Sequence, residues 1–549
     1  MTKARFAAGG VVVLLAAAFI AWKFFPIQLV TMLDRIRNPI AETQEVVWQK
    51  GPATPPEGQR PPNIILIVAD DLGINDLTAT GTGVANGLVP TPNIDALARE
   101  GAQFDTGYAG SATCSPSRAA LMTGRYPARF GFEYTAVPKA FARNLAAPVP
   151  GRLHQPIYHP EREGQMPTLE DMGVPEDQVT IAELLKGRGY RTLHVGKWHL
   201  GESPKMRPET QGFDESLGIM LGAGKFLSED DPDVVNAKLD YDPIDRFLWI
   251  FGTDAVQKNG GQRFHVGEYM TDYYTHQAIA AIDANRNRPF FLYLAYNAPH
   301  TPLQAKRADY EALSSIKDHK TRVYGAMIRA LDRGVGEVVA ALKKKGLDDN
   351  TLIIFTSDNG GAWYLGLPGV NELYRGWKAT FFEGGIRVPF LMRWPGQIAP
   401  GQRVAMPAHH LDFFGTAAAL AGAGVPTDRK MDTVNLLPFV TGTPAAQQER
   451  TLFWRSGDYK VVRQGQWKLQ VAGKPRKAWL FDLATDPTEK VNLAERNPER
   501  VKAMKALLAA HDREMPKPIW PALVEDAIRI DVPLDAPWKA DQEYVYWAN

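Results

Sequence analysis

The sequence of 549 residues predicts an α/β fold: a mostly parallel central sheet with helices on both faces, plus a smaller C-terminal α+β subdomain with an antiparallel sheet. Two observations predict the central sheet. Short continuous apolar runs, typical of strands buried on both faces, recur at residues 63–69, 192–195, 290–295, 351–356 and 388–392. Helical patterns alternate with them, at residues 94–100, 117–122, 181–188, 268–285 and 324–344. Strands that alternate with helices in this way pair in parallel.

Single residues set the expected ends of these helices. Asn93 and Thr180 are expected N-caps, because their side chains accept hydrogen bonds from the first free N–H groups of a helix. Gly101 and Gly346 are expected to end helices. Two stretches rich in Pro, Gly and charge interrupt the alternation, and we expect both to be long surface insertions: residues 139–177 and 226–263.

The C-terminal part of the sequence has a different hydrophobic pattern. Residues 459–463 and 467–471 alternate between apolar and polar side chains and predict an antiparallel hairpin, which a helix at 498–514 follows. The sequence is therefore divided into a signal or anchor (1–33), a Pro- and Gly-rich linker (34–62), a catalytic α/β domain (63–440) and a C-terminal subdomain with an aromatic-rich tail (441–549).

The N-terminus carries an export signal of one of two kinds. Lys3 and Arg5 precede an uncharged apolar run at residues 6–22, which would be about 26 Å long as a helix, close to the thickness of a bilayer core. An uncleaved membrane anchor explains this length better than a cleaved signal peptide, whose nearest cleavage site is at residues 16–18. Either alternative places the body outside the cytosol, in the periplasm, an organelle lumen or the extracellular space.

Composition excludes several classes of protein. The formal net charge is only +1, with 62 Lys+Arg against 61 Asp+Glu, so the chain lacks the net basic surface that a nucleic-acid binder needs. Cys114 is the only cysteine, which excludes an intramolecular disulfide and any metal site built from several cysteines.

Two pairs of hard oxygen ligands each follow a predicted buried strand. Asp70 and Asp71 follow the first strand, and Asp358 and Asn359 follow the strand at 351–356. Ligands bind at the carboxyl ends of the strands in α/β sheets, and oxygen ligands of this kind suit Ca²⁺, with Mg²⁺ as the alternative ion. Either pair alone would be read as ordinary turn residues. Two such pairs, each closing a buried strand, favour a metal site.

Cationic and titratable groups are expected at the same edge. Cys114 and Arg118 lie at i and i+4 where a helix begins, a position that favours a bound anion. A lone cysteine is usually a small buried hydrophobe, but the neighbours of Cys114 are polar and turn-forming. Further groups follow strands or lie in a Gly-rich loop, and with a metal ion they would hold a tetrahedral oxyanion. These groups are Lys197, His199, His300 and Lys378. The segment 409–412 (His-His-Leu-Asp) begins an apolar helix and is read as a core or cap element.

Two motifs carry a resemblance to a known family. The segment Cys114-Ser115-Pro116-Ser117-Arg118, followed by Gly124-Arg125, resembles the C-x-P-x-R signature of the type I (formylglycine-dependent) sulfatases, in the alkaline-phosphatase-like superfamily. Residues 189–201, which contain Gly-Lys-Trp-His, resemble the second signature, and residues 483–489 resemble a recurring C-terminal segment.

The resemblance implies a mechanism. Cys114 would be oxidised to formylglycine by a formylglycine-generating enzyme, and the aldehyde hydrate would attack the sulfur of a sulfate ester. A Ca²⁺ ion would be held by Asp70, Asp71, Asp358, Asn359 and the modified residue at 114. By the same resemblance Arg118 and Lys197 stabilise the hydrate, His199 helps deprotonate it, His300 protonates the leaving oxygen and Lys378 binds sulfate. The products are inorganic sulfate and an alcohol or phenol.

Two other functions are compatible with the same motifs. A formylglycine-dependent phosphonate monoester or phosphodiester hydrolase would use the same groups on a different ester. A non-catalytic binding protein would keep the scaffold, but such a protein would be expected to lose Cys114 or a metal-binding Asp, and all are present. The sequence does not predict which aryl, alkyl or carbohydrate ester is hydrolysed, nor the oligomeric state.

Overall fold

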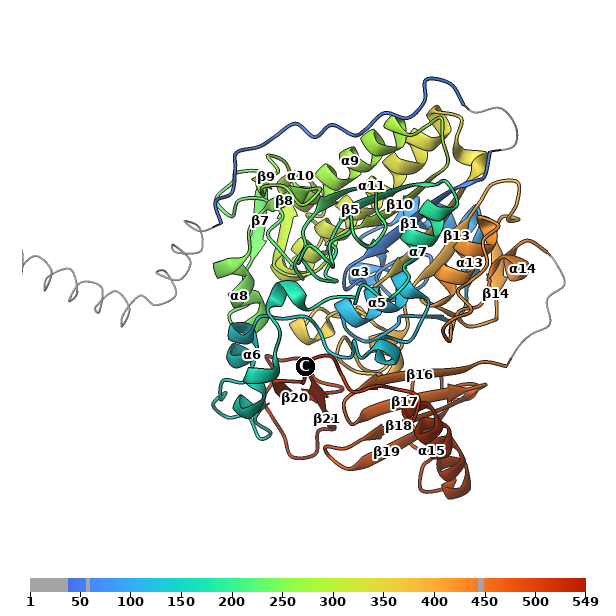
Figure 1. Cartoon of the computed structure of the whole chain (residues 1–549). Helices are drawn as coiled ribbons and strands as arrows, with labels where there is room; N and C mark the ends of the chain where they lie inside the picture. The colour runs from blue at the N-terminus through green and yellow to red at the C-terminus, as the bar shows by residue number, and fades with distance from the viewer. Residues whose placement is uncertain (1–37, 56–59, 443–448) are drawn as a thin grey trace, which may run out of the picture.

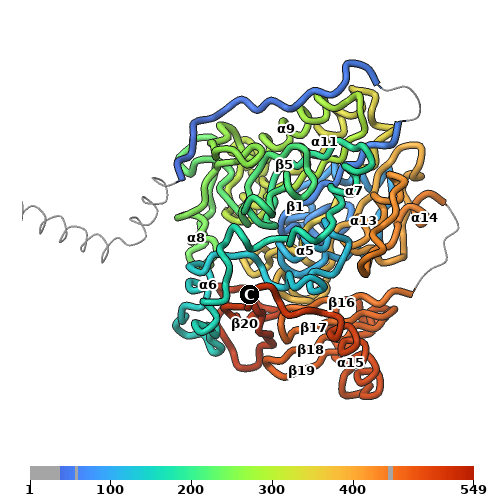
Figure 2. The backbone as a smooth tube through the Cα atoms, viewed as in Figure 1, coloured from blue at the N-terminus to red at the C-terminus, as the bar shows by residue number. Residues whose placement is uncertain are grey.

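The computed structural model describes residues 38–55, 60–442 and 449–549 (Figure 1). The signal or anchor predicted at residues 1–33 lies outside these ranges, and so does part of the predicted linker. Across the described ranges, no helix has the length and apolar character needed to cross a membrane. Residues 38–55 run along the outside of the molecule past α9 (Met270–Ala284; Figure 2). There Trp48 Nε1 donates a hydrogen bond to Gln277 (3.0 Å).

A ten-stranded mixed sheet forms the centre of the molecule. Its strands, in spatial order, are β14 (Gln402–Val404), β2 (Ala102–Phe104), β13 (Phe390–Arg393), β12 (Thr351–Ser357), β1 (Asn63–Ala69), β10 (Phe290–Ala295), β5 (Arg191–Gly196), β6 (Glu215–Gly218), β8 (Ala255–Lys258) and β9 (Phe264–His265). The five strands from β12 to β6 are parallel. The strand predicted at 388–392 is β13, which is antiparallel to β12.

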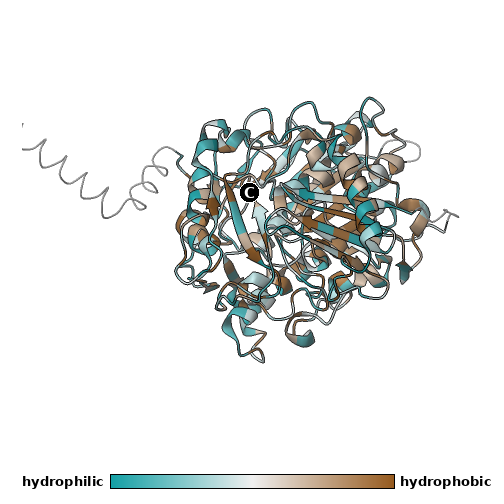
Figure 3. Cartoon of the chain, turned by 90° about the horizontal axis from the view of Figure 1, so that it is seen from below, coloured by the Kyte–Doolittle hydropathy of each residue, from teal (hydrophilic) through white to brown (hydrophobic). Residues whose placement is uncertain are grey.

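Every residue of β1 is buried, because the strand lies between two layers of helices. Ile65, Ile67 and Ala69 point into one hydrophobic core, and the residues between them point into the other. The first core is covered by α4 (Pro92–Arg99), α9 and α11 (His319–Lys344). The second is covered by α5 (Cys114–Thr123), α7 (Ile181–Gly187) and α13 (Asp412–Leu420). Hydrophobic residues accordingly gather on the strands of the central sheet (Figure 3).

The C-terminal region adds two antiparallel sheets. The four-stranded sheet consists of β16 (Thr451–Ser456), β17 (Tyr459–Gln464), β18 (Trp467–Ala472) and β19 (Lys477–Asp482), with α15 (Pro498–Asp512) packed on it. The three-stranded sheet consists of β4 (Ile157–Tyr158), β20 (Val524–Arg529) and β21 (Tyr544–Ala548). The predicted hairpin and helix are confirmed, and the domain boundary at 440 stays a prediction.

The remaining elements are short. Two small sheets pair β7 (Val234–Ala237) with β11 (Leu303–Lys306) and β3 (Gly107–Tyr108) with β15 (Ala408–His409). The short helices are α3 (Val84–Gly87), α6 (Lys139–Leu145), α8 (Pro243–Phe251), α10 (Arg307–Glu311), α12 (Glu383–Ile386) and α14 (Leu437–Val440).

Several local predictions are corrected. The stretch 226–263 is not a surface insertion alone, because it supplies β8 to the central sheet. The stretch 139–177 is tied to the C-terminal region, because β4 pairs with β20. The N-cap of α4 is Thr91 instead of Asn93, because Pro92 occupies the first turn. The end of that helix is as predicted, because Gly101 directly follows its C-cap residue, Glu100.

Candidate active site

The carboxyl ends of the central parallel strands carry the predicted site residues. Asp70 and Asp71 follow β1, Asp358 and Asn359 follow β12, and His300 lies in the turn after β10. Because these strands are parallel neighbours, their ends meet at one edge of the sheet. All five residues are buried, and His300 is the most exposed of them, at 7%. The structure therefore brings these five side chains together at one edge of the sheet, as the strand-end rule predicts, and their role as a site stays a prediction.

The acidic turns hold one another in place. Asp71 has a φ of 64°, and this left-handed turn lets its N–H donate to Asp358 Oδ1 (3.2 Å). Asn359 Nδ2 donates to Asp71 Oδ1 (2.7 Å). The other side-chain atom of Asn359, the acceptor Oδ1, is buried and has no hydrogen-bond partner among the described residues. A buried carbonyl oxygen without a donor is a free ligand atom.

Cys114 opens α5 and faces the first acidic turn. Its Sγ lies 3.6 Å from Asp70 Oδ1. Arg118 lies one turn further along the helix and is completely buried, with its Nε 2.9 Å from Asp358 Oδ2 and its Nη2 3.9 Å from Asp70 Oδ1. Cys114 and Arg118 thus reach the same carboxylate, as their i, i+4 spacing predicts.

Two lysines complete the charge balance. Lys197 is fully buried, and its Nζ lies 2.7 Å from Asp70 Oδ2. Lys378 Nζ lies 2.7 Å from Asp71 Oδ1 and 3.3 Å from Cys114 Sγ, and 12% of its side chain is exposed. Lys378 is therefore the cation that both contacts Cys114 and reaches toward solvent.

These charges shift the pKa values of the groups they surround. Burial raises the pKa of the Cys114 thiol, but the ammonium groups of Lys197 and Lys378 outweigh burial and bring the pKa down to about 7. Burial, and then the neighbouring Asp358 carboxylate, raise the pKa of Asp70 to about 7. Burial also raises the pKa of Asp358, but Arg118 outweighs it and holds that pKa well below its usual range.

The two predicted histidines have different environments. His300 Nε2 lies 3.6 Å from Asp71 Oδ2, beside the acidic turn. His199 does not share a strand face with Lys197, because β5 ends at Gly196 and His199 has a φ of 58°. Its Nε2 bonds to the carbonyl oxygen of Ala136 (3.0 Å), which can only accept, so Nε2 carries the proton. Burial, followed by the Lys197 ammonium, lowers the pKa of His199 to about 3, so the ring is neutral with a free Nδ1.

The donor atoms fit a divalent cation. One ligand atom from each of Asp70, Asp71, Cys114 and His300 lies within 4.8 Å of the others. The raised pKa of Asp70 reflects carboxylates crowded in a buried space, and a cation there would relieve that repulsion. Together with the free Oδ1 of Asn359, these oxygens form a donor set suited to a hard cation.

Sequence reasoning missed Tyr293, whose hydroxyl lies 3.2 Å from Arg118 Nη1. It lies inside the apolar run of β10, so nothing in the pattern marks it. His410 was read as a core residue, and the structure agrees: its ring bonds to the hydroxyls of Ser117 (3.1 Å) and Thr356 (3.2 Å). Asp412 is the first residue of α13 and not its N-cap; its buried carboxylate accepts the His409 N–H (2.8 Å) and pairs with Arg450 (2.5 Å), which is a core role.

The chain matches known sulfatases over most of its length. A family model named Sulfatase matches residues 62–423, and a model of the C-terminal region of N-sulphoglucosamine sulphohydrolase matches residues 375–514. The chain is 36% identical over 416 residues to the N-acetylgalactosamine-6-sulfatase of Mus musculus, covering 74% of this chain and 72% of that protein. It is 32% identical over 502 residues to arylsulfatase A of Homo sapiens, covering 82% and 87%.

Solved structures show the same relationship. Ps i-CgsB, determined in complex with k-i-k-neocarrahexaose, is 33% identical and superposes with a TM-score of 0.69 over 84% of this chain and 95% of that one. A phosphonate monoester hydrolase of Agrobacterium radiobacter superposes with a TM-score of 0.54 over 83% and 96%, and at 21% identity this likeness shows a common fold alone. The chain therefore belongs to the sulfatase family and is a sulfuric ester hydrolase.

Proposed function

We propose that the chain hydrolyses sulfate esters of carbohydrates with formylglycine at position 114. The observation that carries the proposal is the position of Cys114: the only cysteine begins α5, 3.6 Å from Asp70 and 3.3 Å from the partly exposed Lys378. The hydrate of formylglycine supplies an oxygen nucleophile, and its second hydroxyl allows sulfate to leave by elimination. A formylglycine-generating enzyme is the partner that this maturation requires.

Asp70, Asp71, Asp358, Asn359 and the residue at 114 would hold the metal ion, which we propose is Ca²⁺, with Mg²⁺ as the alternative. The ion supplies Lewis-acid stabilisation of negative charge. The nearby ammonium and guanidinium groups act on the same charge. Lys197 and Arg118 are fully buried, so they would orient and stabilise the oxygens at position 114. Lys378 is partly exposed and would bind the sulfate group of the substrate.

The two histidines would move protons. His199 is neutral with a free Nδ1, which is the state that a general base needs, so it would take a proton from the group at position 114. His300 lies beside Asp71, which together with Asp70 raises its pKa against the lowering effects of burial and Lys378. A raised pKa keeps the imidazole protonated, as a general acid for the leaving oxygen must be.

The carbohydrate substrate is supported by the relatives, which include a sulfatase named for N-acetylgalactosamine and a structure with a bound neocarrahexaose. Export is supported by the leading charges and apolar run at the N-terminus. A membrane tether through that run remains part of this proposal.

A panel of esters tests the proposal. The enzyme, made with its maturing enzyme and calcium, is expected to hydrolyse carbohydrate sulfates with a higher kcat/KM than a phosphonate monoester or a phosphodiester. A Cys114→Ala variant is the matched control and should have no activity on any of them. A higher kcat/KM for the phosphonate or phosphodiester would overturn the assignment of sulfate as the preferred group.

A further inference from the structure

The loop that presents Lys378, residues 376–382, contacts the catalytic edge of the sheet through the N–H of Lys378, which donates to the carbonyl oxygen of Gly361 (3.4 Å). Thr380 Oγ1 accepts the N–H of Trp377 (3.0 Å), which closes a tight turn around Lys378. Ala379 has a φ of 65°, a left-handed conformation that costs an alanine about 1–2 kcal/mol. Its N–H donates to the carbonyl oxygen of Ala112 (2.8 Å). A strained backbone persists only where neighbouring residues hold it in place. The residues that hold this turn therefore also determine the position of Lys378.

The C-terminal region supplies hydrogen bonds to this loop from three different elements. Tyr459 of β17 accepts the N–H of Phe381 with its hydroxyl (3.1 Å). Trp377 Nε1 donates to the carbonyl oxygen of Arg529 in β20 (2.9 Å). Glu489, which follows β19, accepts the N–H of Glu383 with Oε2 (2.5 Å). The loop is therefore tied down on both sides of Lys378 by residues far away in the sequence.

A buried charge cluster joins these ties into one network. Lys468 Nζ of β18 lies 2.8 Å from Glu383 Oε1 and 3.0 Å from Glu489 Oε1, and all three side chains are fully buried. Gln470 Nε2 donates to Glu489 Oε1 (2.9 Å), and the Gln470 amide oxygen accepts the hydroxyl of Tyr459. The network thus connects Tyr459 to Glu383 without a break. Glu383 is the residue that directly follows the Lys378 loop.

We propose that Tyr459, Lys468 and Glu489 are positioning residues for Lys378, which makes the C-terminal region part of the catalytic apparatus. The inference rests on the sulfate-binding role proposed for Lys378. Within the described ranges none of the three contacts Cys114, Asp70 or Asp71, so they act through the loop. The inference also gives a role to the segment 483–489, because its last residue, Glu489, is buried and accepts the N–H of Glu383.

A double-mutant cycle tests this coupling. Tyr459→Phe removes the hydroxyl that accepts the Phe381 N–H and donates to the Gln470 amide oxygen, and the loss of these two buried hydrogen bonds is expected to lower kcat/KM about 10-fold. Because the loop would hold Lys378 less well, the inhibition constant of inorganic sulfate should rise by a similar factor. In a Lys378→Ala background, Tyr459→Phe should change kcat/KM less than about 2-fold, because its effect passes through Lys378.

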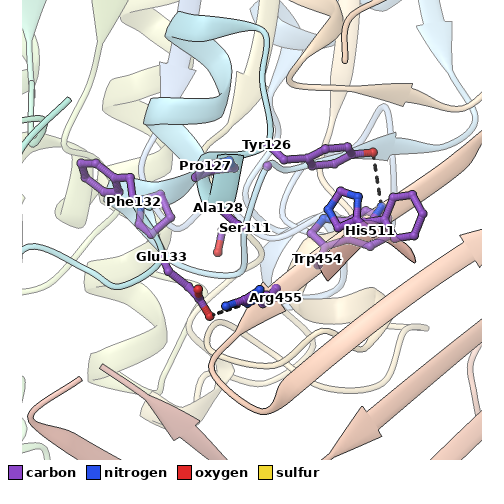
Figure 4. Close-up of a pocket in the computed structure, with 12 residues that line it drawn as sticks. Ser111, Tyr126, Pro127, Ala128, Phe132, Glu133, Trp454, Arg455 and His511 are labelled. Atoms are coloured by element: carbon purple, nitrogen blue, oxygen red, sulfur yellow. Dashed lines mark hydrogen bonds and ion pairs between the residues drawn. The ribbon is translucent and has the colours of Figure 1, made fainter. Parts of the chain in front are cut away.

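Tyr126→Phe is the matched control. The Tyr126 hydroxyl also accepts a backbone N–H across the boundary with the C-terminal strands, that of Phe453 (3.3 Å; Figure 4), but Tyr126 lies outside the Lys378 loop. This variant should lose similar thermal stability and leave the inhibition constant of sulfate unchanged. An equal loss of kcat/KM from Tyr459→Phe in both backgrounds would overturn the inference. An unaltered kcat/KM in Lys378→Ala alone would instead overturn the role proposed for Lys378.

Discussion

Charge compensation among single residues organises the site. Three buried carboxylates of the site each contact a cation: Asp70 contacts Lys197, Asp71 contacts Lys378, and Asp358 contacts Arg118. Leaving any of these charges buried without a partner would be costly, so the six groups are interdependent. Cys114 lies where the Asp70 and Asp71 pairs meet, so the residue at this position experiences both cations and carboxylates.

The role of His300 gives a prediction at the residue scale. His300→Ala is expected to lower kcat on alkyl sulfates by roughly 10²–10⁴-fold, because their poor leaving groups need a proton. Activated aryl sulfates leave as stable phenolates, so the loss on them should be much smaller. Steady-state rates on a series of leaving groups of different pKa measure this difference. Equal losses across the series would contradict the general-acid role.

Strand alternation and turn chemistry predict much of the site but not all of it. The residues Asp70, Asp71, Asp358 and His300 follow buried strands, so the sequence places them at one edge. The conformation of His199 is not predictable in this way, because its positive φ depends on the bonds of the surrounding turn. Lys378 reaches the site from a loop, and only the tertiary structure shows which residues hold it.

At the scale of elements, the close approach of β5 to its neighbours positions Lys197. Gly196 ends β5 with a φ of 117°, and a Cβ there would lie 1.9 Å from the carbonyl oxygen of Ala295 in β10. The next residue, Lys197, donates its N–H to that same carbonyl oxygen (2.7 Å). The glycine therefore lets the strand approach β10 closely enough to direct Lys197 toward Asp70.

Gly196→Ala should disturb this approach. The forbidden φ and the collision with Ala295 are expected to lower the free energy of unfolding by about 2–5 kcal/mol. Urea denaturation measures the loss. Gly187→Ala is the matched control, because a Cβ at that position would meet no atom within 4 Å, and its effect should stay within about 0.5 kcal/mol. Similar stability of the two variants would contradict the argument.

Hydrophobic periodicity predicts where the strands lie better than it predicts which strands pair. The apolar runs identify β1, β5, β10 and β12, because a strand buried on both faces is largely apolar. The strand β8 was missed, because it is short and half polar and lies inside a polar stretch, next to the edge strand β9. The contact between residues 139–177 and β20 joins distant parts of the chain, which no local pattern reveals.

The whole molecule joins a sheet that carries the site to a C-terminal region that braces one of its loops. The near-zero net charge of the chain conceals a strongly charged centre, where buried carboxylates and cations pair. The acidic residues gather around the proposed cation, and the basic residues gather around the proposed sulfate. Both lie at the same edge of the central sheet.

Metal binding gives a prediction for the whole molecule. The cation would relieve repulsion among the buried carboxylates, so removing it with a chelator is expected to lower Tm. Calcium at 100 times its Kd should restore about 2.7 kcal/mol of stability. Differential scanning calorimetry measures the shift, and Asp71→Asn should weaken the response to calcium. A Tm that is independent of calcium in the unsubstituted protein would contradict the proposed metal site.

The central claim is that Cys114 is the precursor of the nucleophile. The mass of the peptide that contains Cys114, measured in enzyme produced with a formylglycine-generating enzyme, tests it most directly. We predict the mass change of –SH to =O in active enzyme, with activity in proportion to the converted fraction. Protein that hydrolyses sulfate esters while its Cys114 peptide carries only the unmodified thiol would contradict the account.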